Sequence, residues 1–292
     1  MRPGRRAILF AAGAALAWAA SQLSPAEAQT LPVSELAAHT HVHGLAVDRH
    51  DPDALLIATH HGLFRAGPDG KAERVSVVQD FMGFNPHPSD PNTLYASGHP
   101  AEGGNLGFIA STDGGRTWQQ ISPGANGPVD FHQMTVSPAD PQRIYGAYGA
   151  LQASKDGGNT WTMVAPLPDR LIDLAASAKD VRTLYAATER GLLVSRDGGA
   201  TWQAVLEGAP ASMVEVAPDG RLYAFMLGRG LLASAEDSLE FETVSGDWGN
   251  VFLLHLALDP KNPGRLFGAT QAGVVLASTD GGRTWKPFGA PG

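Results

Sequence analysis

Short apolar runs alternate with turn residues along most of the chain. Residues 44–47, 55–58 and 191–194 are runs of this kind, each about four residues long. Gly, Pro, Asp and Ser separate successive runs at intervals of about eight to twelve residues. Apolar runs this short, bounded by turn residues, favour β-strands over helices. The pattern therefore predicts an all-β protein that is rich in turns.

One eight-residue pattern, S-x-D-G-G-x-T-W, occurs four times, beginning at Ser111, Ser154, Ser195 and Ser278. The first three copies begin about 40 residues apart, and the fourth follows at about twice that distance. A weaker copy at residues 234–237 fills the gap, and a still weaker one at residues 66–70 precedes the first. Six units of about 40 residues match the period of four-stranded propeller blades.

Each octet lies between two apolar runs, as in strand–turn–strand. The paired glycines allow positive φ, and the Asp and Ser side chains can bond to backbone amides within the turn. The Trp can bury a large area between neighbouring blades. We assign a structural role to Ser111, Asp113, Gly115, Thr117, Trp118, Ser154, Asp156, Gly158, Thr160, Trp161, Ser195, Asp197, Gly199, Thr201, Trp202, Ser278, Asp280, Gly282, Thr284 and Trp285.

The octet resembles the Asp-box, or BNR, repeat of sialidases, sortilin-type receptors and photosystem II assembly factors. In those families the box is a hairpin turn that stabilises the fold away from the active site. The whole chain is similar to small exported bacterial Asp-box proteins that are often labelled glycosylhydrolase-like. The resemblance implies a fold and no particular activity: a single six-bladed β-propeller over residues 29–292, with blades at about 43–78, 82–121, 132–165, 172–206, 213–244 and 254–288. Residues 30–35 either add a strand to the last blade or pack against the other end of the chain.

The N-terminus has the form of an export signal. Arg2, Arg5 and Arg6 precede an apolar run at residues 7–20, and residues 26–28 read A-E-A. This arrangement predicts a secretory signal peptide cut after Ala28 and a periplasmic or secreted protein. The arginine pair also resembles a twin-arginine signal, and an ordinary signal fits equally well. No later stretch is long enough to span a membrane.

Composition excludes several classes of partner and site. The formal net charge is −8, and loss of the arginine-containing leader would make the protein more acidic. We therefore expect neither nucleic acid nor an anionic membrane surface as a partner. The chain contains no Cys, which rules out disulfides and thiolate metal sites.

Most of the ten histidines map to one face of the predicted propeller. Strands alternate in direction within a blade, so innermost-strand starts and second-to-third loops share one face, and the octet turns lie on the other. His50 and His87 fall in turns on the octet face. The other eight fall on the opposite face: His39, His41, His43, His60, His61, His99, His132 and His255.

This histidine-rich face is a candidate metal site. Counting back eight residues from the aspartates of the first turns places His43, Met82, His132 and Ile172 at equivalent positions near the axis. Met213 is the best match in the fifth blade, and the last blade offers Leu254 or His255. Imidazole with thioether suits copper, and imidazole alone suits zinc or nickel. Alternatively, these side chains simply fill the funnel or contact a protein. The candidate ligands are His41, His43, His60, His61, His99, His132, His255, Met82 and Met213.

The octet resemblance raises the question of glycosidase activity. A sialidase needs three substrate-binding arginines, a Tyr–Glu nucleophile pair and an Asp acid, and its usual Arg-Ile-Pro start is absent. Arg116 and Arg283 belong to octets. Four tyrosines occupy one repeat position, which indicates packing: Tyr95, Tyr145, Tyr185 and Tyr223. A true sialidase is therefore not expected.

A generic glycosidase needs two facing carboxylates. Candidates on the histidine-rich face are Glu102, Asp130, Asp173, Glu189 and Glu215, of which Asp173 and Glu215 lie in innermost strands. The leading hypothesis is an exported, non-enzymatic binding or assembly protein with no catalytic residues, whose face holds copper or zinc. The alternatives are a carbohydrate-active hydrolase that uses Asp173 and Glu215, and a scaffold that docks a protein or glycan.

Overall fold

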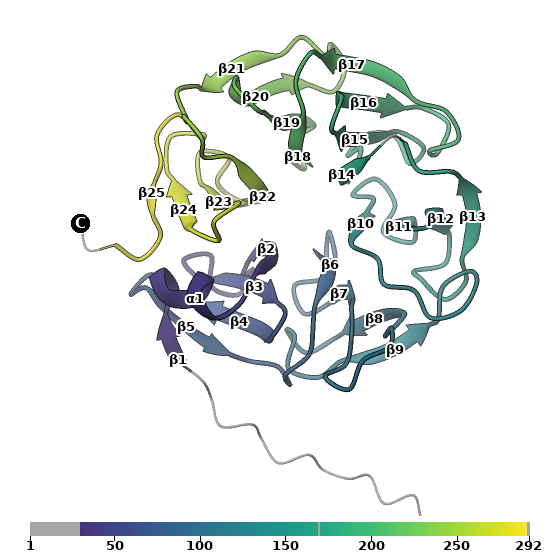
Figure 1. Ribbon diagram of the computed structural model, residues 1–292, viewed down its shortest axis with the longest axis horizontal. Coiled ribbons are helices and arrows are strands. Elements are labelled where there is room, and N and C mark those ends of the chain that lie inside the picture. Colours follow the sequence, from purple (N-terminus) through teal and green to yellow (C-terminus); the bar gives the residue numbers. More distant parts are fainter. Residues whose placement is uncertain (1–29, 169, 291–292) are drawn as a thin grey trace, which may run out of the picture.

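The computed structural model describes residues 30–168 and 170–290, and the predicted signal peptide lies outside them. Six antiparallel β-sheets stand around a central axis as the blades of a propeller (Figure 1). The fold is nearly all-β, and its helix, α1 (Val33–His39), is short. Within the described residues, no helix is long and apolar enough to cross a membrane.

In every blade the first strand lies nearest the axis. The first blade contains β2 (Val42–Val47), β3 (Leu55–Thr59), β4 (Gly62–Ala66) and β5 (Lys71–Arg74). The second contains β6 (Met82–Pro86), β7 (Leu94–Ser97), β8 (Phe108–Ser111) and β9 (Gln119–Ser122). The third contains β10 (Gln133–Val136), β11 (Ile144–Tyr148), β12 (Ala150–Ser154) and β13 (Thr162–Ala165).

The remaining blades follow the same order. The fourth contains β14 (Leu171–Ala176), β15 (Leu184–Thr188), β16 (Gly191–Ser195) and β17 (Gln203–Glu207). The fifth contains β18 (Ala211–Val216), β19 (Arg221–Met226), β20 (Gly230–Ala235) and β21 (Glu242–Ser245). The sixth contains β22 (Leu253–Leu258), β23 (Leu266–Thr270), β24 (Val275–Ser278) and β25 (Lys286–Pro287).

Each octet forms the turn between the third and fourth strands of its blade. In the first copy, the backbone N–H of Gly115 donates to Ser111 Oγ at 2.8 Å, and that of Thr117 donates to Asp113 Oδ1 at 2.9 Å. The Thr117 hydroxyl donates to Asp113 Oδ2 at 2.6 Å. The other three copies repeat these bonds, so the Ser, Asp and Thr side chains of every octet are hydrogen-bonded within eight residues.

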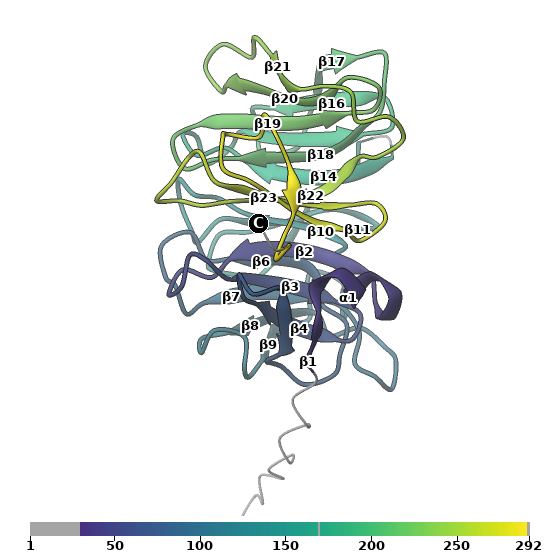
Figure 2. The same ribbon diagram turned by 90° about the vertical axis from the view of Figure 1, so that its left-hand side faces the viewer.

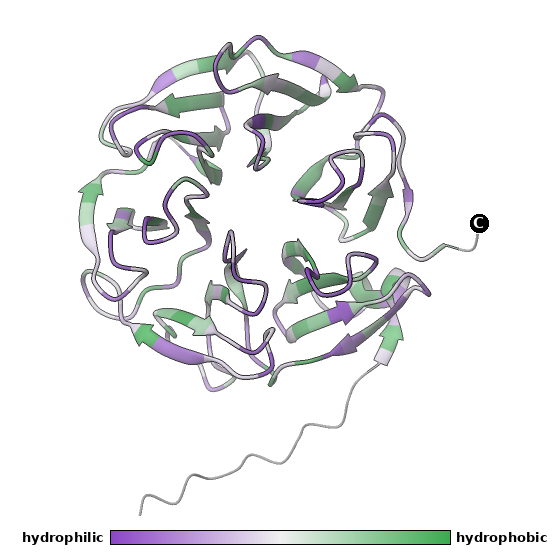
Figure 3. Ribbon diagram, turned by 180° about the vertical axis from the view of Figure 1, so that it is seen from behind, coloured by the Kyte–Doolittle hydropathy of each residue, from purple (hydrophilic) through white to green (hydrophobic). Residues whose placement is uncertain are grey.

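The octet tryptophans contribute to the apolar layers between blades. Trp161 is buried, and its ring lies 5.4 Å from that of Phe108 in the second blade and 4.7 Å from that of Phe131. Burying an indole between blades removes a large apolar area from water. Figure 3 shows the result: the strands are mainly hydrophobic and the connecting turns mainly hydrophilic.

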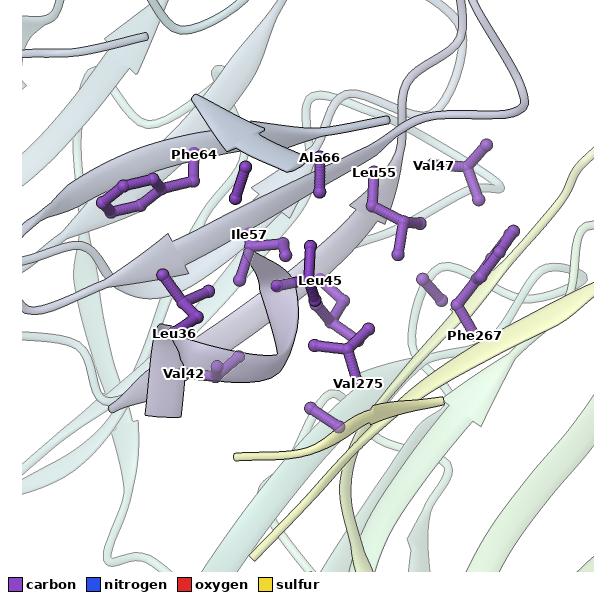
Figure 4. Close-up of a cluster of buried hydrophobic side chains, with 14 of the residues drawn as sticks. Leu36, Val42, Leu45, Val47, Leu55, Ile57, Phe64, Ala66, Phe267 and Val275 are labelled. Atoms are coloured by element: carbon purple, nitrogen blue, oxygen red, sulfur yellow. The ribbon is translucent and has the colours of Figure 1, made fainter. Parts of the chain in front are cut away.

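The N-terminal segment helps to close the ring. Strand β1 (Thr30–Pro32) pairs with β5 and so adds a fifth strand to the first blade, not to the last. Helix α1 follows directly beside the first blade (Figure 2). Its Leu36 is fully buried in a cluster that also contains Phe267 and Val275 of the sixth blade (Figure 4). Of the two arrangements left open by the sequence, the packing of the two ends is the one observed.

The six innermost strands, β2, β6, β10, β14, β18 and β22, surround a central cavity of about 900 Å³. The β3–β4 and β7–β8 loops and the segments before β6 and β10 contribute to the same end of this cavity. The repeat thus brings loops from separate blades together at the axis.

Candidate metal centre

Six of the histidines assigned to one face line the central cavity: His41, His43, His60, His99, His132 and His255. His39 ends α1 and is exposed, and it does not line the cavity. His61 is exposed in the β3–β4 turn and also lies outside the lining.

The first group of ligand atoms comes from His43, His60 and Asp80. These atoms all lie within 4.8 Å of one another. His60 Nδ1 is 3.1 Å from Asp80 Oδ2, and the rings of His43 and His60 are 4.1 Å apart. His43 lies in β2 and His60 in the tight β3–β4 turn. The segment before β6 brings in Asp80, and its next residue, Phe81, donates its backbone N–H to the carbonyl of Thr59 at 3.1 Å.

Two atoms of this triad lack hydrogen-bond partners. His43 Nε2 and Asp80 Oδ1 are both buried and unpaired, and they face each other across 3.8 Å. Burial, together with nearby histidines beginning with His60, lowers the pKa of His43 to about 3. The imidazole is therefore neutral at neutral pH. Buried unpaired polar atoms are rare and costly, whereas a metal ion with bonds of about 2.0–2.2 Å can satisfy a nitrogen and an oxygen at this separation.

A second group of ligand atoms comes from His99, Asp130 and His132, again within 4.8 Å of one another. Asp130 Oδ2 lies 2.9 Å from His99 Nε2 and 2.7 Å from His132 Nε2, and buried Asp130 Oδ1 has no partner. The hydrogen bond that the His132 ring donates to Asp130 raises the pKa of His132. His99 Nδ1 lies 2.7 Å from the carbonyl of Gly104. A backbone carbonyl on the far side of the ring is the usual support of a metal-ligating histidine.

The remaining predicted ligands differ in their access to the cavity. The exposed ring of His41 lies 5.3 Å from that of His60 and can supply a further ligand. His255 Nε2 lies 3.2 Å from the Val42 carbonyl, which joins β22 to β2, and burial lowers its pKa to about 4. Met82 is buried and lines the cavity.

Met213 lies elsewhere, fully buried in the apolar cluster of Tyr223 and Phe225 and not in the cavity lining. Four innermost strands, β2, β14, β18 and β22, begin with a register shift that leaves one residue unpaired, and these residues are His43, Ile172, Ser212 and Leu254. Ser212, not Met213, is therefore the equivalent of His43. The counting fails because the turn of the fifth blade at residues 218–220 is shorter than the Asp-Pro turns.

Asp80 was not among the sequence candidates, although the repeat contains a signal for it. Asp80-Phe81 precedes the innermost strand of the second blade as Asp130-Phe131 precedes that of the third. Phe81 lies 4.7 Å from the ring of Trp118, the same distance as between Phe131 and Trp161. An alignment of the segments that precede β6 and β10 matches Asp80-Phe81 with Asp130-Phe131. A search for histidines alone does not find this match.

Asp173 and Glu215 occupy the fourth and fifth blades and also line the cavity. Asp173 accepts hydrogen bonds from the backbone N–H groups of Leu174 and Val214 at 2.9 and 3.0 Å. Burial raises the pKa of Asp173 to about 7, and burial together with Asp173 raises that of Glu215 to about 8. At neutral pH Glu215 therefore keeps most of its proton, whereas Asp173 is about half protonated. The other candidates, Glu102 and Glu189, are exposed, and Glu189 pairs with Arg170 at 2.7 Å.

Comparison with known proteins shows the fold but no family. No protein-family model and no curated protein sequence matches the chain. A gluconolactonase from Xanthomonas campestris matches over 86% of this chain and 89% of its own, with TM-score 0.62 and 16% identity. A GH74 enzyme of Niastella koreensis matches over 85% of this chain, with TM-score 0.59 and 16% identity. YCF48 bound to a D1 peptide matches over 91% of this chain and 85% of its own, with TM-score 0.52 and 20% identity.

These similarities leave the activity open. The chain covers only 45% of the GH74 enzyme. Identities of 16–20% establish the propeller architecture alone. The similar structures include two enzymes and a protein captured with a peptide, so the function has to be argued from the residues of the cavity.

Proposed function

We propose that the protein is an exported, non-enzymatic binding protein that holds a divalent transition-metal ion at His43, His60 and Asp80. The observation that carries this proposal is the pair of buried, unpaired atoms, His43 Nε2 and Asp80 Oδ1, that face each other at 3.8 Å. A cation between them would satisfy both atoms and offset the cost of their burial. The predicted leader at residues 1–28 supports export.

The ligand set favours zinc. Two imidazoles and one carboxylate are borderline-hard ligands that suit zinc, and a three-ligand site keeps a position open for water or a partner's group. We propose His41, whose exposed ring lies 5.3 Å from that of His60, as the residue that would fill that position. Copper remains the alternative if the Met82 thioether takes part, because copper accepts soft ligands. Thiolates cannot contribute in a chain without Cys.

Metal titration of the mature chain, prepared without a histidine tag, tests the proposal. Calorimetry with Zn²⁺ and Cu²⁺ should show tight binding that His43→Ala and Asp80→Asn each weaken by more than the ~10–100-fold typical of outer-shell changes. His50→Ala is the matched control, because His50 is exposed in a turn and bonds Asn92 at 2.9 Å. Absence of binding, or equal affinity in all four proteins, would reject the metal site.

A carbohydrate-active hydrolase is the second candidate. It is favoured by Asp173 and Glu215, which line one cavity with pKa values raised to about 7 and 8, since a general acid must hold its proton near neutral pH. Turnover of chromogenic glycosides that Asp173→Asn or Glu215→Gln abolishes would support it. A protein that bound no metal and turned over no glycoside would point to a docking surface for a protein partner or a glycan. The similar structure of YCF48, which contains a bound D1 peptide, is a precedent for a docking role of this kind.

A further inference from the structure

We propose that the histidine-rich face holds two metal ions, the second of them between His99, Asp130 and His132. This inference rests on the proposed metal-binding function and extends it to a two-ion centre. The first ion would lie at His43, His60 and Asp80.

The repeat builds two of the three ligands of each triad at matching places. Each triad takes its carboxylate from the segment before an innermost strand: Asp80 before β6 and Asp130 before β10. Each takes one histidine from the second-to-third loop of the preceding blade, His60 for Asp80 and His99 for Asp130. The third ligands differ, because His43 lies in β2 of the blade that carries His60, whereas His132 lies beside Asp130 just before β10. Duplication of a carboxylate and a loop histidine at matching places is expected of a repeated site and not of scattered surface residues.

The hydrogen bonds of the second triad favour a cation between its ligand atoms. If His99 Nδ1–H donates to the Gly104 carbonyl at 2.7 Å, a neutral His99 presents a bare lone pair at Nε2. That lone pair lies 2.9 Å from the carboxylate oxygen of Asp130. Two electron-rich atoms at this distance repel each other unless a positive charge lies between them. A second proton on His99 or a metal ion supplies that charge, and of the two only a metal ion also offers a bond to the buried, unpaired Asp130 Oδ1.

The two triads adjoin each other. The backbone N–H of Asp80 donates to the carbonyl of His99 at 3.0 Å, and Gln79 pairs with Pro100 in an isolated antiparallel bridge. The carboxylate of the first triad and an imidazole of the second therefore come from directly bonded chain segments. His43, His60, His99 and His132 line the same cavity of about 900 Å³. Two ions held by these ligands would share one solvent space.

A tilted aromatic pair lies next to each of the two carboxylates. Phe81 and Phe131 are fully buried next to Asp80 and Asp130. Their rings pack on octet tryptophans at the same 4.7 Å. A ligand attached to a buried, packed neighbour is preorganised, which lowers the entropy lost on binding.

Metal stoichiometry tests the inference in the full mature chain. We expect two Zn²⁺ per chain after dialysis, measured by elemental analysis and calorimetry, and one in Asp130→Asn. Asp80→Asn should also retain one, the His50→Ala control should retain two, and the double variant should retain none. His99→Ala, at an exposed ring, is a second way to remove the second ion if Asp130→Asn fails to fold.

The outcomes separate the two claims. No bound ion in the wild type would reject the metal-binding function itself. One ion that is lost in Asp80→Asn but kept in Asp130→Asn would overturn the second site and leave the first standing.

Electron paramagnetic resonance of the Cu²⁺-loaded protein tests whether the ions share a centre. Two neighbouring Cu²⁺ ions should broaden each other's lines and give a half-field signal, which each single-site variant should lack. A wild-type spectrum equal to the sum of the two variant spectra would overturn the shared centre.

Discussion

The two faces of the propeller use similar polar residues in opposite ways. In an octet, Asp113 accepts hydrogen bonds from the Thr117 hydroxyl and from two backbone N–H groups only three and four residues away. On the histidine-rich face, Asp80 meets His43 and His60 from separate chain segments, and one of its buried oxygens remains unpaired. A carboxylate whose oxygens accept hydrogen bonds from residues a few positions away is typical of a structural turn. Convergence of side chains from distant segments, with atoms left unpaired, is the arrangement on which the proposed metal site rests.

The largest expected effect comes from Trp161→Ala, where the two faces are linked. The change leaves a cavity beside Phe108 and Phe131 and should lower the free energy of unfolding by about 3–5 kcal/mol, measured by urea denaturation. Because Phe131 adjoins Asp130, the metal affinity of the second triad should fall. The metal affinity of the first triad, which contains His43, should stay at the wild-type value. A loss of both ions in the folded variant would contradict the separation of the triads.

Asp80→Asn should act on the metal and spare the fold. The metal affinity of the first triad should fall by more than about 100-fold, which is about 2.7 kcal/mol. The metal-free variant should melt at or above the wild-type temperature, because an amide replaces a buried carboxylate with an unpaired oxygen. Thermal unfolding in the presence of a chelator measures this. A clear drop in melting temperature without metal would show that Asp80 is a structural residue.

The same chemical change in an octet should have the reverse outcome. Asp113→Asn weakens the charged bond to the Thr117 hydroxyl and should cost about 1 kcal/mol, or about 2–4 °C in melting temperature. Metal stoichiometry should stay at the wild-type value. An altered stoichiometry would mean that the two faces are coupled through more than the aromatic stacks.

The last expected effect is a change in the pH dependence of stability, without a change in metal binding, from Glu215→Gln. The folded-state pKa of Glu215, about 8, lies above the ordinary value of about 4.3, so the folded protein keeps a proton that the unfolded chain has lost. This contribution is fully present below about pH 4 and disappears as the pH rises to about 8. Between pH 5 and 8 the melting temperature of Glu215→Gln should therefore fall less than that of the wild type. Parallel curves would show that the Glu215 pKa is ordinary.

The sequence allowed much of the fold to be predicted because the information is local and repeated. Each octet carries its own turn chemistry, and the period of about 40 residues gives the blade. Ring closure was not predictable, because β1 is three residues long and shows no periodicity. Its pairing with β5 accompanies the packing of Leu36 against the sixth blade, and both contacts join residues that are far apart in the sequence.

The candidate site was only partly predictable for a related reason. The histidines could be assigned to one face because strand direction alternates regularly. Met213 was misplaced by one residue because the fifth blade has a shorter first turn, and a shift of one residue in a strand reverses the side-chain direction. Asp80 was missed because its role depends on His43 and His60, which approach it only in three dimensions.

The closure of the ring has a consequence for the order of events in maturation. Helix α1 packs its Leu36 across the junction of the first and last blades and then runs directly into Thr40, His41 and β2. The segment that completes the circle is thus the segment that delivers His41 and His43 to the axis. The second triad draws its ligands from the second and third blades, and its ion would not depend on this closure. Metal uptake at the first triad would follow closure of the ring, and its ion would then stabilise the closed form.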